Sequence, residues 1–383
     1  MQKIQINNWK WLIENTALLN GWFASWKDFA RNSVVKQNPV RVVFKVEDLF
    51  YVKLEQPLGF WRKMRNFFSP KAAREFAAGR ALEDAGVPVV KHLGWAKRAS
   101  SNMLLTEAMS DSCSVHEYWH NEIVYGNALK KTFLENFAEF LKVFFASGFY
   151  HPDFHLGNIL YSPTTESFAL VDVYGVSRPK RLSGQQIAEH SRIFLELYRG
   201  LSDFEAVDFL MKIRNDLSLE DARKFLAAGL RGKTARAQKV WPKRQAQIQN
   251  NYSKFVEVLN IADNEFLVRK ILGSAPAVSL DKIPNCLTGN YFDIMRLPYG
   301  EAEDLWLESF RLELLGIDHL RPLLFEKPGV LYFEKVPDGA PKAPQDKAEE
   351  FIARAKTAGV EVNAESLLQL SNGRIAIAKL FHD

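Results

Sequence analysis

The sequence has few of the features that would place it in a special class. It contains two cysteines, Cys113 and Cys286, too few for a disulfide framework or a cysteine-ligated zinc site, so we expect a reducing compartment. No run of 18 apolar residues occurs, and any membrane contact is therefore expected to be peripheral. Residues 1–10 lack the apolar core of a signal peptide, which favours a cytoplasmic location.

A strong excess of either charge is also missing. Lys plus Arg number 50 against 45 Asp plus Glu, which gives a net charge of +5. That balance is mild for a nucleic-acid binder and no recognised nucleic-acid motif accompanies it, so no nucleic-acid partner is expected. Hydrophobic residues make up 47% of the 383 residues, which is enough to bury a sizeable core in two to three packed units of about 150 residues each.

The apolar pattern changes along the chain. Residues 41–55 predict a hairpin, a helix then runs from Pro70 to Gly86, and two more strands follow it. From residue 110 the pattern is mainly helical, and residues 186–260 read as helix. An antiparallel sheet with one helix, followed by a helical part, is an α+β arrangement. We divide the chain into residues 1–39 (an N-terminal extension), 40–109, 110–279 and 280–383 (a smaller α/β unit).

One loop carries the clearest chemistry. His151, Asp153 and Asn158 have the H-x-D-x-x-x-x-N spacing of a kinase catalytic loop, and Asp172 follows in an apolar strand. Upstream, Lys53 stands in an apolar strand and Glu75 lies on the next helix. Phosphoryl transfer needs such a set, because one carboxylate accepts a proton while an amide oxygen and a second carboxylate hold magnesium. Polar residues also decorate ordinary turns, but four elements in this order make coincidence improbable.

The sequence resembles the bacterial lipopolysaccharide kinase family of the protein-kinase-like superfamily, which includes kinases of inner-core heptose and of 3-deoxy-manno-octulosonic acid (Kdo). The resemblance covers roughly residues 35–260 and lies on FYVKLEQPLGFW (50–61), GFYHPDFHLGNIL (148–160) and ALVDVYGVSRPKRL (169–182). It implies the two-lobed kinase fold, with an N-lobe over residues 40–109 and a helical C-lobe over residues 110–279. It also implies an ATP- and Mg²⁺-dependent transfer of phosphate to a sugar hydroxyl of a glycolipid, by an enzyme that is cytoplasmic or peripheral on the inner membrane.

The same resemblance implies a role for each of eight residues. They are the catalytic base Asp153 with His155 near the γ-phosphate, the magnesium ligands Asn158 and Asp172, the phosphate-binding Lys53 held by Glu75, and Glu107 and Met109, whose backbone would bind adenine. Two features depart from the protein-kinase pattern. No G-x-G-x-x-G precedes Lys53, and Pro152 replaces the arginine of the catalytic loop.

Other functions stay open. Small-molecule kinases of the aminoglycoside type and protein kinases share the catalytic spacing, and a pseudokinase scaffold could bind nucleotide without turnover. Residues 116–120 (HEYWH) match the H-E-x-x-H motif of zinc proteases, although no convincing third ligand follows.

Two stretches of the sequence indicate that an anionic membrane surface could be a partner. Arg231, Lys233, Arg236 and Lys239 lie in a stretch without acidic residues, which is either a solvated helix face or an anion-binding patch. Residues 60–68 interleave aromatic and basic side chains in a loop that suits a membrane interface, and packing against the fold would explain it equally well.

The last hundred residues show internal similarity to the first part. Residues 302–337 repeat the plan of residues 71–109, namely a helix ending at glycine, two strands and a late glutamate. Aligned on Gly148 and Gly359, Asp153 becomes Ala364 and Asn158 becomes Gln369, while aligning the later strands turns Asp172 into Lys379. We therefore predict a truncated, catalytically dead kinase-like unit, with an unrelated α/β tail as the alternative.

Overall fold

The computed structural model describes residues 1–24, 34–124, 129–181, 183, 186, 189–190, 192–197, 200–261, 263–271, 275–276, 278–280, 283, 287, 291–336, 339–370 and 374–378. Cys286 and Lys379 lie outside these ranges. The chain forms two compact units. Unit 1 comprises Met1–Trp119, Leu129–Ile193 and Lys212–Arg214, and unit 2 comprises His120–Ala128, Phe194–Met211 and Asn215–Asp383. No helix among the described residues is long and apolar enough to cross a membrane.

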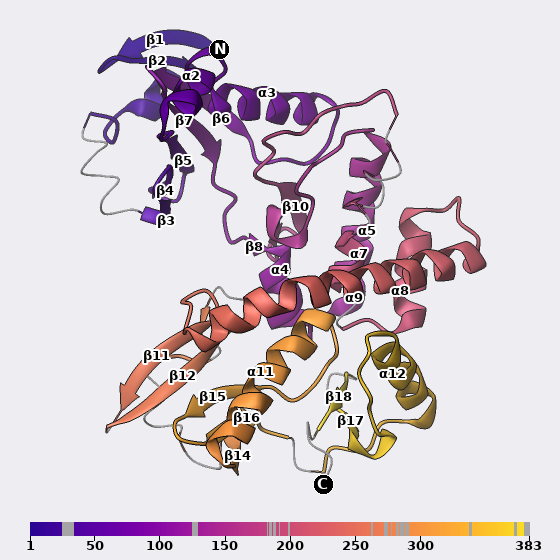
Figure 1. Cartoon of the computed structure of the whole chain (residues 1–383). Coiled ribbons are helices and arrows are strands. Elements are labelled where there is room, and N and C mark those ends of the chain that lie inside the picture. The colour runs from indigo at the N-terminus through magenta and orange to yellow at the C-terminus, as the bar shows by residue number, and fades with distance from the viewer. Residues whose placement is uncertain are drawn as a thin grey trace. The chain divides into compact units, whose positions relative to one another are not determined.

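An antiparallel sheet dominates unit 1 (Figure 1). In the described residues it has seven strands in the order β1-β2-β6-β7-β5-β4-β3. Their bounds are β1 (Gln2–Ile6), β2 (Trp9–Ile13), β3 (Val34–Asn38), β4 (Arg41–Val46), β5 (Phe50–Glu55), β6 (His92–Arg98) and β7 (Ser101–Glu107). The hairpin, the helix and the two following strands expected from residues 41–109 are confirmed, with α3 (Lys71–Asp84) as the helix.

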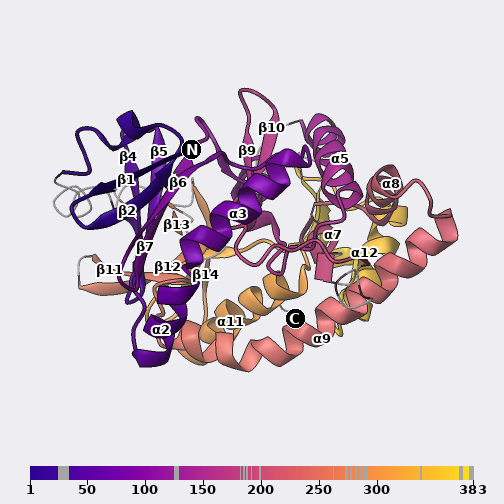
Figure 2. The same cartoon turned by 90° about the horizontal axis from the view of Figure 1, so that it is seen from above.

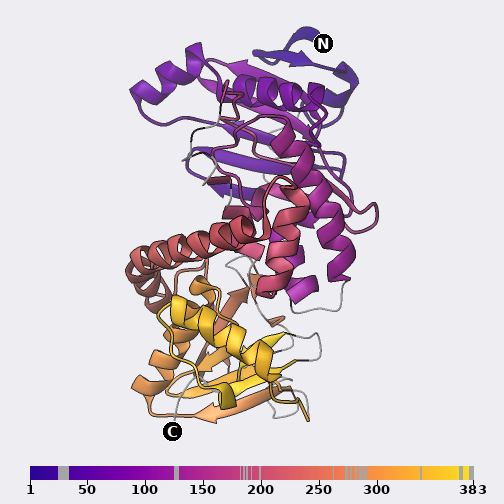
Figure 3. The same ribbon diagram turned by 90° about the vertical axis from the view of Figure 1, so that its right-hand side faces the viewer.

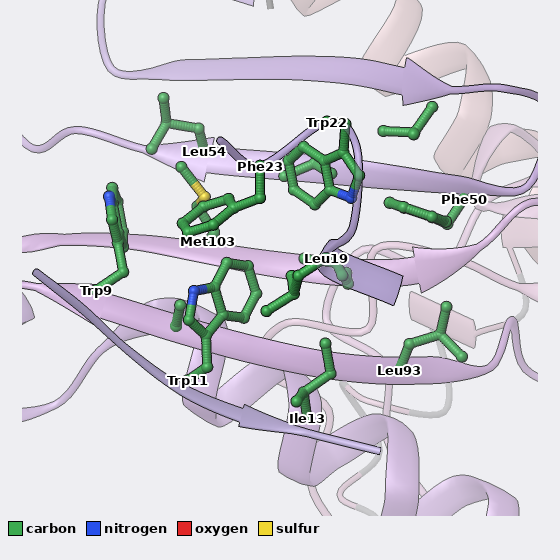
Figure 4. Close-up of a cluster of buried hydrophobic side chains, with 14 of the residues drawn as sticks. Trp9, Trp11, Ile13, Leu19, Trp22, Phe23, Phe50, Leu54, Leu93 and Met103 are labelled. Atoms are coloured by element: carbon green, nitrogen blue, oxygen red, sulfur yellow. The ribbon is translucent and has the colours of Figure 1, made fainter. Parts of the chain in front are cut away.

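The residues expected to form a separate N-terminal extension are part of this sheet. Strand β2 pairs with β6, with Trp11 opposite Ala96. Trp9, Trp11 and Ile13 alternate with exposed or half-buried neighbours and are each at most 2% exposed, as in a strand that packs one face on a core. They form a cluster with Trp22, Phe23 and other apolar side chains over one face of the sheet (Figure 4). Burial of these aromatic rings is what joins the first residues to the sheet.

The remainder of unit 1 carries the catalytic-loop motif on short elements. These are β8 (Cys113–Ser114), α4 (Val115–Tyr118), α5 (Lys130–Ala146), the 3-10 helix η3 (Leu156–Asn158), β9 (Ile159–Ser162) and β10 (Ser167–Leu170). A π-helix, η2 (Trp119–Val124), follows α4, and all of it after Trp119 belongs to unit 2. The expected apolar stripe of α5 is buried, and Phe137 packs within 5.0 Å of Phe168 on β10, centroid to centroid. Residues 60–68, expected as a loop, instead form the helix α2 (Phe60–Phe68).

Unit 2 combines helices with a second antiparallel sheet (Figure 3). Its helices are α8 (Asp203–Ile213, whose last residues fall in unit 1), α9 (Leu219–Gln249), α11 (Tyr299–Leu315) and α12 (Gln345–Thr357), and α7 (Arg192–Leu197) leads into it. Its strands are β11 (Val256–Ile261), β12 (Asn264–Ile271), β13 (Ala275–Pro276), β14 (Phe292–Arg296), β15 (Pro322–Glu326) and β16 (Val330–Glu334). Helix α11 packs along α9 (Figure 2).

The expected boundary at residues 279 and 280 falls inside this second sheet. The helical pattern expected up to residue 260 ends earlier, because β11 begins at Val256 and forms a hairpin with β12. Strand β12 then pairs with β15, so its backbone hydrogen bonds are satisfied within unit 2. Antiparallel sheets with separate groups of helices make an α+β fold, as expected. The two-lobed kinase arrangement stays a prediction.

The helix and antiparallel strand pair predicted for residues 302–337 are confirmed as α11, β15 and β16. The order β11-β12-β15-β16-β14 also repeats β1-β2-β6-β7-β5 of unit 1, with the helix in the same connection. Leu170 and Ile377 occupy matching positions. The N–H of Val90 donates to Leu170 O, just as the N–H of Leu320 donates to Ile377 O, at 3.0 and 2.9 Å. These parallels support the predicted degenerate unit.

The structure corrects two positions in the predicted alignment. A 3-10 helix, η4 (Ala364–Ser366), and the hairpin β17 (Leu367–Gln369) and β18 (Ile375–Ile377) follow α12, as η3, β9 and β10 follow α5. The N–H of Ala378 donates to Ser366 O as the N–H of Val171 donates to Asn158 O. Asn158 therefore matches Ser366, and Asp153, five residues earlier, matches Glu361. Alignment on the glycines had given Gln369 and Ala364, because the connection after Gly359 is shorter than that after Gly148.

Replacement of a buried tryptophan by alanine should show that the first strands are integral to unit 1. Trp11 is 2% exposed and its ring lies 4.9 Å from that of Phe23, whereas Trp61 on α2 is 81% exposed. We expect Trp11→Ala to lower the free energy of unfolding by about 3–5 kcal/mol through lost burial and a residual cavity. Trp61→Ala should change it by less than about 0.5 kcal/mol. Urea unfolding followed by circular dichroism measures both, and equal stability of the two variants would contradict the packing described.

Candidate active site

A buried lysine lies at the centre of the predicted site. Lys53 Nζ is 2.7 Å from Glu75 Oε1 on α3 and also pairs with Asp172 Oδ1, which follows β10. Its side chain is 13% exposed and that of Glu75 is 4% exposed. The apolar alternation of β5 places Val52 and Leu54 in the core and turns Lys53 to the other face of the sheet, toward α3. The predicted strand-lysine and helix-glutamate pair is therefore formed.

The charges of this cluster depend on one another. Burial alone would lower the pKa of Lys53, but the carboxylates of Glu75 and Asp172 outweigh it and raise that pKa above its ordinary value. Burial would likewise raise the pKa of Asp172, yet the Lys53 ammonium holds it below the ordinary value of 3.8. Both groups are thus charged at neutral pH.

The catalytic-loop motif is fixed by hydrogen bonds and by an aromatic contact. Phe154 stacks on Phe144 of α5, with ring centroids 4.4 Å apart. The N–H of His151 donates to His190 Nε2 at 3.0 Å, and the N–H of Asp153 donates to His151 Nδ1 at 3.2 Å. Burial lowers the pKa of His151 and of His190 to about 4. Both rings are therefore neutral near pH 7, the state in which their nitrogens accept these bonds.

Asp153 and Asn158 are adjacent. Asn158 Nδ2 donates to Asp153 O at 2.9 Å and lies 3.3 Å from Asp153 Oδ2. The side chain of Asp153 is 77% exposed and is therefore accessible to an incoming hydroxyl. Asp172 has a left-handed backbone, with φ of 53°, at the turn that redirects the chain after β10. The structure thus brings Asp153 and Asn158 together, and Asp172 to Lys53.

His155 lies beside the predicted base. Its Nδ1 accepts from the N–H of Gly157 at 3.0 Å and caps η3. The ring proton is therefore assigned to Nε2, which faces Asp153 Oδ2 at 3.5 Å. This residue combines a capping role with a position in the site.

The residues expected to bind adenine lie at the end of β7. The N–H of Glu107 donates to Lys91 O, that of Ala108 donates to Leu49 O, and Met109 O accepts from the hydroxyl of Ser112. None of these bonds uses the carbonyl of Glu107 or the N–H of Met109. An acceptor and a donor two residues apart are what an adenine edge requires, so the predicted contacts are compatible with the backbone here.

The turn between β3 and β4 stands where protein kinases have a glycine-rich loop before the lysine strand. It is built on Asn38, whose Oδ1 accepts from the N–H groups of Val40 and Arg41 at 3.0 and 2.8 Å. Lys36 and Arg41 on this hairpin contribute to lowering the pKa of Asp172. Sequence reasoning missed these two cations. A turn held by asparagine thus replaces the glycine-rich loop.

A second network, also missed from the sequence, joins α3 to the segment after Asp172. The ring of Tyr174 has Lys71 Nζ 4.8 Å from its centroid and the guanidinium of Arg74 4.9 Å from it. Lys71 Nζ also pairs with Glu55 at 2.9 Å. Such cation–π contacts could have been sought only once α3 and the D-V-Y-G segment were known to be neighbours.

Pro152, the departure from the kinase arginine, has a packing role. Gly175 has φ of 84°, and a Cβ atom built there would lie 3.2 Å from Pro152 Cγ. The proline therefore packs against the glycine that ends the D-V-Y-G segment, and both a positive φ and close contact favour glycine at that position.

The zinc-protease alternative has no support. Glu117 of the HEYWH stretch caps the start of α4, accepting from the N–H and the hydroxyl of Ser114 at 3.1 and 2.9 Å. Within the ranges that the structure describes, no three His, Cys, Asp or Glu side chains are placed to hold a metal ion. Glu117 is thus used in a capping box with Ser114, which gives it a structural role at the start of α4.

The oxygen atoms of Asn158 and Asp172 suit Mg²⁺. Because Nδ2 of Asn158 is engaged with Asp153, its Oδ1 is the atom left for a cation. Because Oδ1 of Asp172 pairs with Lys53, its Oδ2 remains. One amide and one carboxylate oxygen, completed by phosphate oxygens and water, form a usual magnesium set. The residues present fit the ion.

Comparison with family models matches this region of the chain. Residues 60–190 match the lipopolysaccharide kinase (Kdo/WaaP) family. The resemblance expected from the sequence is confirmed for this segment, which is about a third of the chain. It starts at α2, after Lys53, and includes the other seven predicted site residues, namely Glu75, Glu107, Met109, Asp153, His155, Asn158 and Asp172. No curated protein matches the chain.

Removal of the buried ammonium should destabilise the protein in a pH-dependent way. Lys53→Met leaves the buried Glu75 without its partner, so we expect a loss of about 3 kcal/mol at pH 7. The folded-state pKa of Asp172 is depressed by its ion pair with Lys53. The stability that this ion pair contributes is therefore present above about pH 4 and is lost as the pH falls. The stability gap to the wild type should narrow at low pH. The control is Lys45→Met, which removes a lysine from an exposed surface ion pair. Urea unfolding measures the free energy of unfolding of both variants, and an equal decrease in the two would contradict the buried ion pair of Lys53.

Acid should weaken the fold before the carboxylates titrate. The pKa values of His92, His151 and His190 lie near 4 in the folded state, against 6.5 unfolded. Protons therefore bind the unfolded chain first, and stability should fall between pH 6.5 and 4 by up to about 3 kcal/mol per histidine. Thermal unfolding at pH 7.5 and pH 5 tests this. His190→Gln keeps an acceptor and should reduce the dependence, whereas an unchanged melting temperature in the wild type would refute the buried neutral rings.

Proposed function

We propose that this protein is an ATP- and Mg²⁺-dependent kinase that phosphorylates a sugar hydroxyl of a lipopolysaccharide core, on heptose or Kdo, or of a related glycolipid. The observation that carries the proposal is the meeting, in one compact unit, of the Lys53–Glu75–Asp172 cluster with the Asp153–Asn158 pair. The family match supports kinase activity in lipopolysaccharide synthesis broadly. The heptose or Kdo acceptor is the finer part of the proposal.

Each predicted residue has a task in this reaction. Lys53, held by Glu75, positions the α- and β-phosphates, and the backbone of Glu107 and Met109 holds adenine. Asp153 orients the acceptor hydroxyl and takes its proton while the acceptor oxygen bonds to the γ-phosphorus and the bond to the leaving oxygen of ADP breaks. Asn158 and Asp172 would hold Mg²⁺, which neutralises charge on the phosphates. His155, whose Nε2 lies 3.5 Å from Asp153 Oδ2, would donate from that nitrogen to the γ-phosphate when ATP is bound.

The cations near Asp172 are arranged for a strongly anionic ligand. Lys53 is neutralised by two carboxylates and Arg41 pairs with Glu55, so Lys36 is the cation that adds positive charge from the β3–β4 hairpin. A turn with side-chain cations in place of a glycine-rich loop can contact phosphate through those side chains. This arrangement favours nucleotide binding by the site and argues against a scaffold that has lost its ligand.

Two aspartate variants separate the roles. Asp153→Ala should lower kcat at least about 100-fold, because proton acceptance is lost while nucleotide affinity is largely kept. Asp172→Ala should lower both kcat and the affinity for ATP in the presence of magnesium. Asp84→Ala, an exposed aspartate at the end of α3, is the control. ATP consumption is measured against glycolipid cores, aminoglycosides and protein substrates.

The acceptor panel also decides among the alternatives. Turnover with aminoglycosides or proteins alone would replace the glycolipid assignment with another kinase class. Nucleotide binding without turnover on any acceptor would favour the pseudokinase scaffold. Near-normal turnover by either aspartate variant would refute the catalytic assignment.

A further inference from the structure

Helix α2 is amphipathic and presents its apolar face to solvent. Phe60, Trp61, Met64, Phe67 and Phe68 recur at the spacing of one helix face. Trp61 is 81% exposed and Phe68 is 74% exposed, and no residue of the helix is buried. A helix of a globular protein ordinarily buries this face. Helix α2 does not.

The polar side of α2 is the side that attaches it to unit 1. Asn66 Nδ2 donates to Ser100 O in the β6–β7 turn at 2.6 Å, and Asn66 Oδ1 accepts from the N–H of Lys71 at 3.0 Å. Phe67 of α2 also contacts this unit, because Lys97 Nζ of β6 lies 5.9 Å from the centroid of its ring. The two hydrogen bonds hold the polar face inward and so fix the apolar face outward.

The fold does not need this helix. In unit 2 the matching connection runs from the end of β14 at Arg296 to the start of α11 at Tyr299, with only Leu297 and Pro298 between them. In unit 1 the same connection runs from the end of β5 to the start of α3 and contains the whole of α2. A strand and helix of this kind can therefore be joined directly, and α2 is an addition.

Charge on and beside α2 indicates the occupant. Helix α2 itself carries Arg62, Lys63 and Arg65 and no acidic residue. Aromatic side chains flanked by arginine and lysine are the composition of helices that lie in the interface of an anionic bilayer, where rings enter the acyl boundary and cations meet lipid phosphates. The basic residues of α9 differ. Lys233 donates to Leu195 O, and the exposed Arg231, Arg236 and Lys239 are not interleaved with aromatic residues along α9 as the basic residues of α2 are.

We propose that α2 is a membrane-interface helix that binds unit 1 to anionic lipid through its outward aromatic face and its basic side chains. The benefit for catalysis rests on the proposed function, because a glycolipid acceptor is held in such a membrane and binding there raises its local concentration. The binding itself requires neither ATP nor turnover. It can therefore be tested separately.

Vesicle sedimentation with the full chain tests the proposal. Wild type should bind vesicles of phosphatidylcholine with phosphatidylglycerol more tightly than phosphatidylcholine alone, and less tightly as salt rises. Trp61→Ala with Phe68→Ala should weaken binding at least about tenfold, because two inserted rings are lost. Arg62→Gln, Lys63→Gln and Arg65→Gln together should also weaken it. Two matched controls are expected to bind as wild type. One is Phe204→Ala, which removes a phenylalanine of α8 that is 79% exposed. The other combines Arg231→Gln, Arg236→Gln and Lys239→Gln on α9.

Fluorescence distinguishes insertion from surface attraction. Trp61 should shift to shorter wavelength on vesicle binding, so Trp61→Phe should lose that change and still bind. Absence of binding to anionic vesicles, or equal weakening by the control sets, would overturn the proposal. So would self-association that depends on Trp61 and Phe68 without lipid binding, since a second copy would then cover the face. Turnover of a soluble delipidated acceptor should be equal in wild type and α2 variants, so failure of the kinase assignment leaves the vesicle result interpretable.

Discussion

The buried ammonium of Lys53 is the constraint on which the site depends. A lone cation in that position would be very costly, because burial removes its hydration. Glu75 and Asp172 offset this cost from two other parts of unit 1, α3 and the turn after β10. Strand, helix and loop must therefore be in place together before the lysine is stable. Tyr174, in contact with Lys71 and Arg74 at the start of α3, adds a second link between the same two segments.

Local patterns were sufficient to predict much of unit 1. A lysine in an apolar strand, a glutamate on the next helix and the spacing from Asp153 to Asn158 each leave a mark in the sequence. The strict alternation of Trp9, Trp11 and Ile13 along the strand is also visible in the sequence. These residues were nevertheless predicted to form an N-terminal extension, because the partner of a strand cannot be read from local sequence. Arg41, Lys36 and Tyr174 could not be found this way, since cations on a strand and a tyrosine in a loop have no sequence pattern of their own.

The two related units show which features belong to the fold and which to the chemistry. Strand pairing gives the position in unit 2 that matches Lys53. Phe50 lies opposite Glu107 in unit 1, and Phe292 lies opposite Glu334 in unit 2. Three residues further along each strand, Met295 of β14 therefore matches Lys53 of β5. The same strand order is thus built without a buried lysine at that position. Unit 2 stabilises its core with other pairs, including Arg269 with Glu313 at 2.5 Å. The Lys53 cluster is therefore not required by the topology, which supports its proposed role in phosphate binding.

The same comparison supports the proposed membrane-binding role of α2. Packing accounts for an apolar face only when something covers it, and the two hydrogen bonds of Asn66 turn that face away from unit 1. In unit 2 the matching strand and helix are joined without such a helix, so α2 is not needed to connect β5 to α3. A feature that neither packing nor topology requires is best explained by an external surface. Its position between the strand of Lys53 and the helix of Glu75 would place such a surface close, along the chain, to the phosphate-binding pair. A membrane-bound acceptor and the site that phosphorylates it would then be held by one continuous segment.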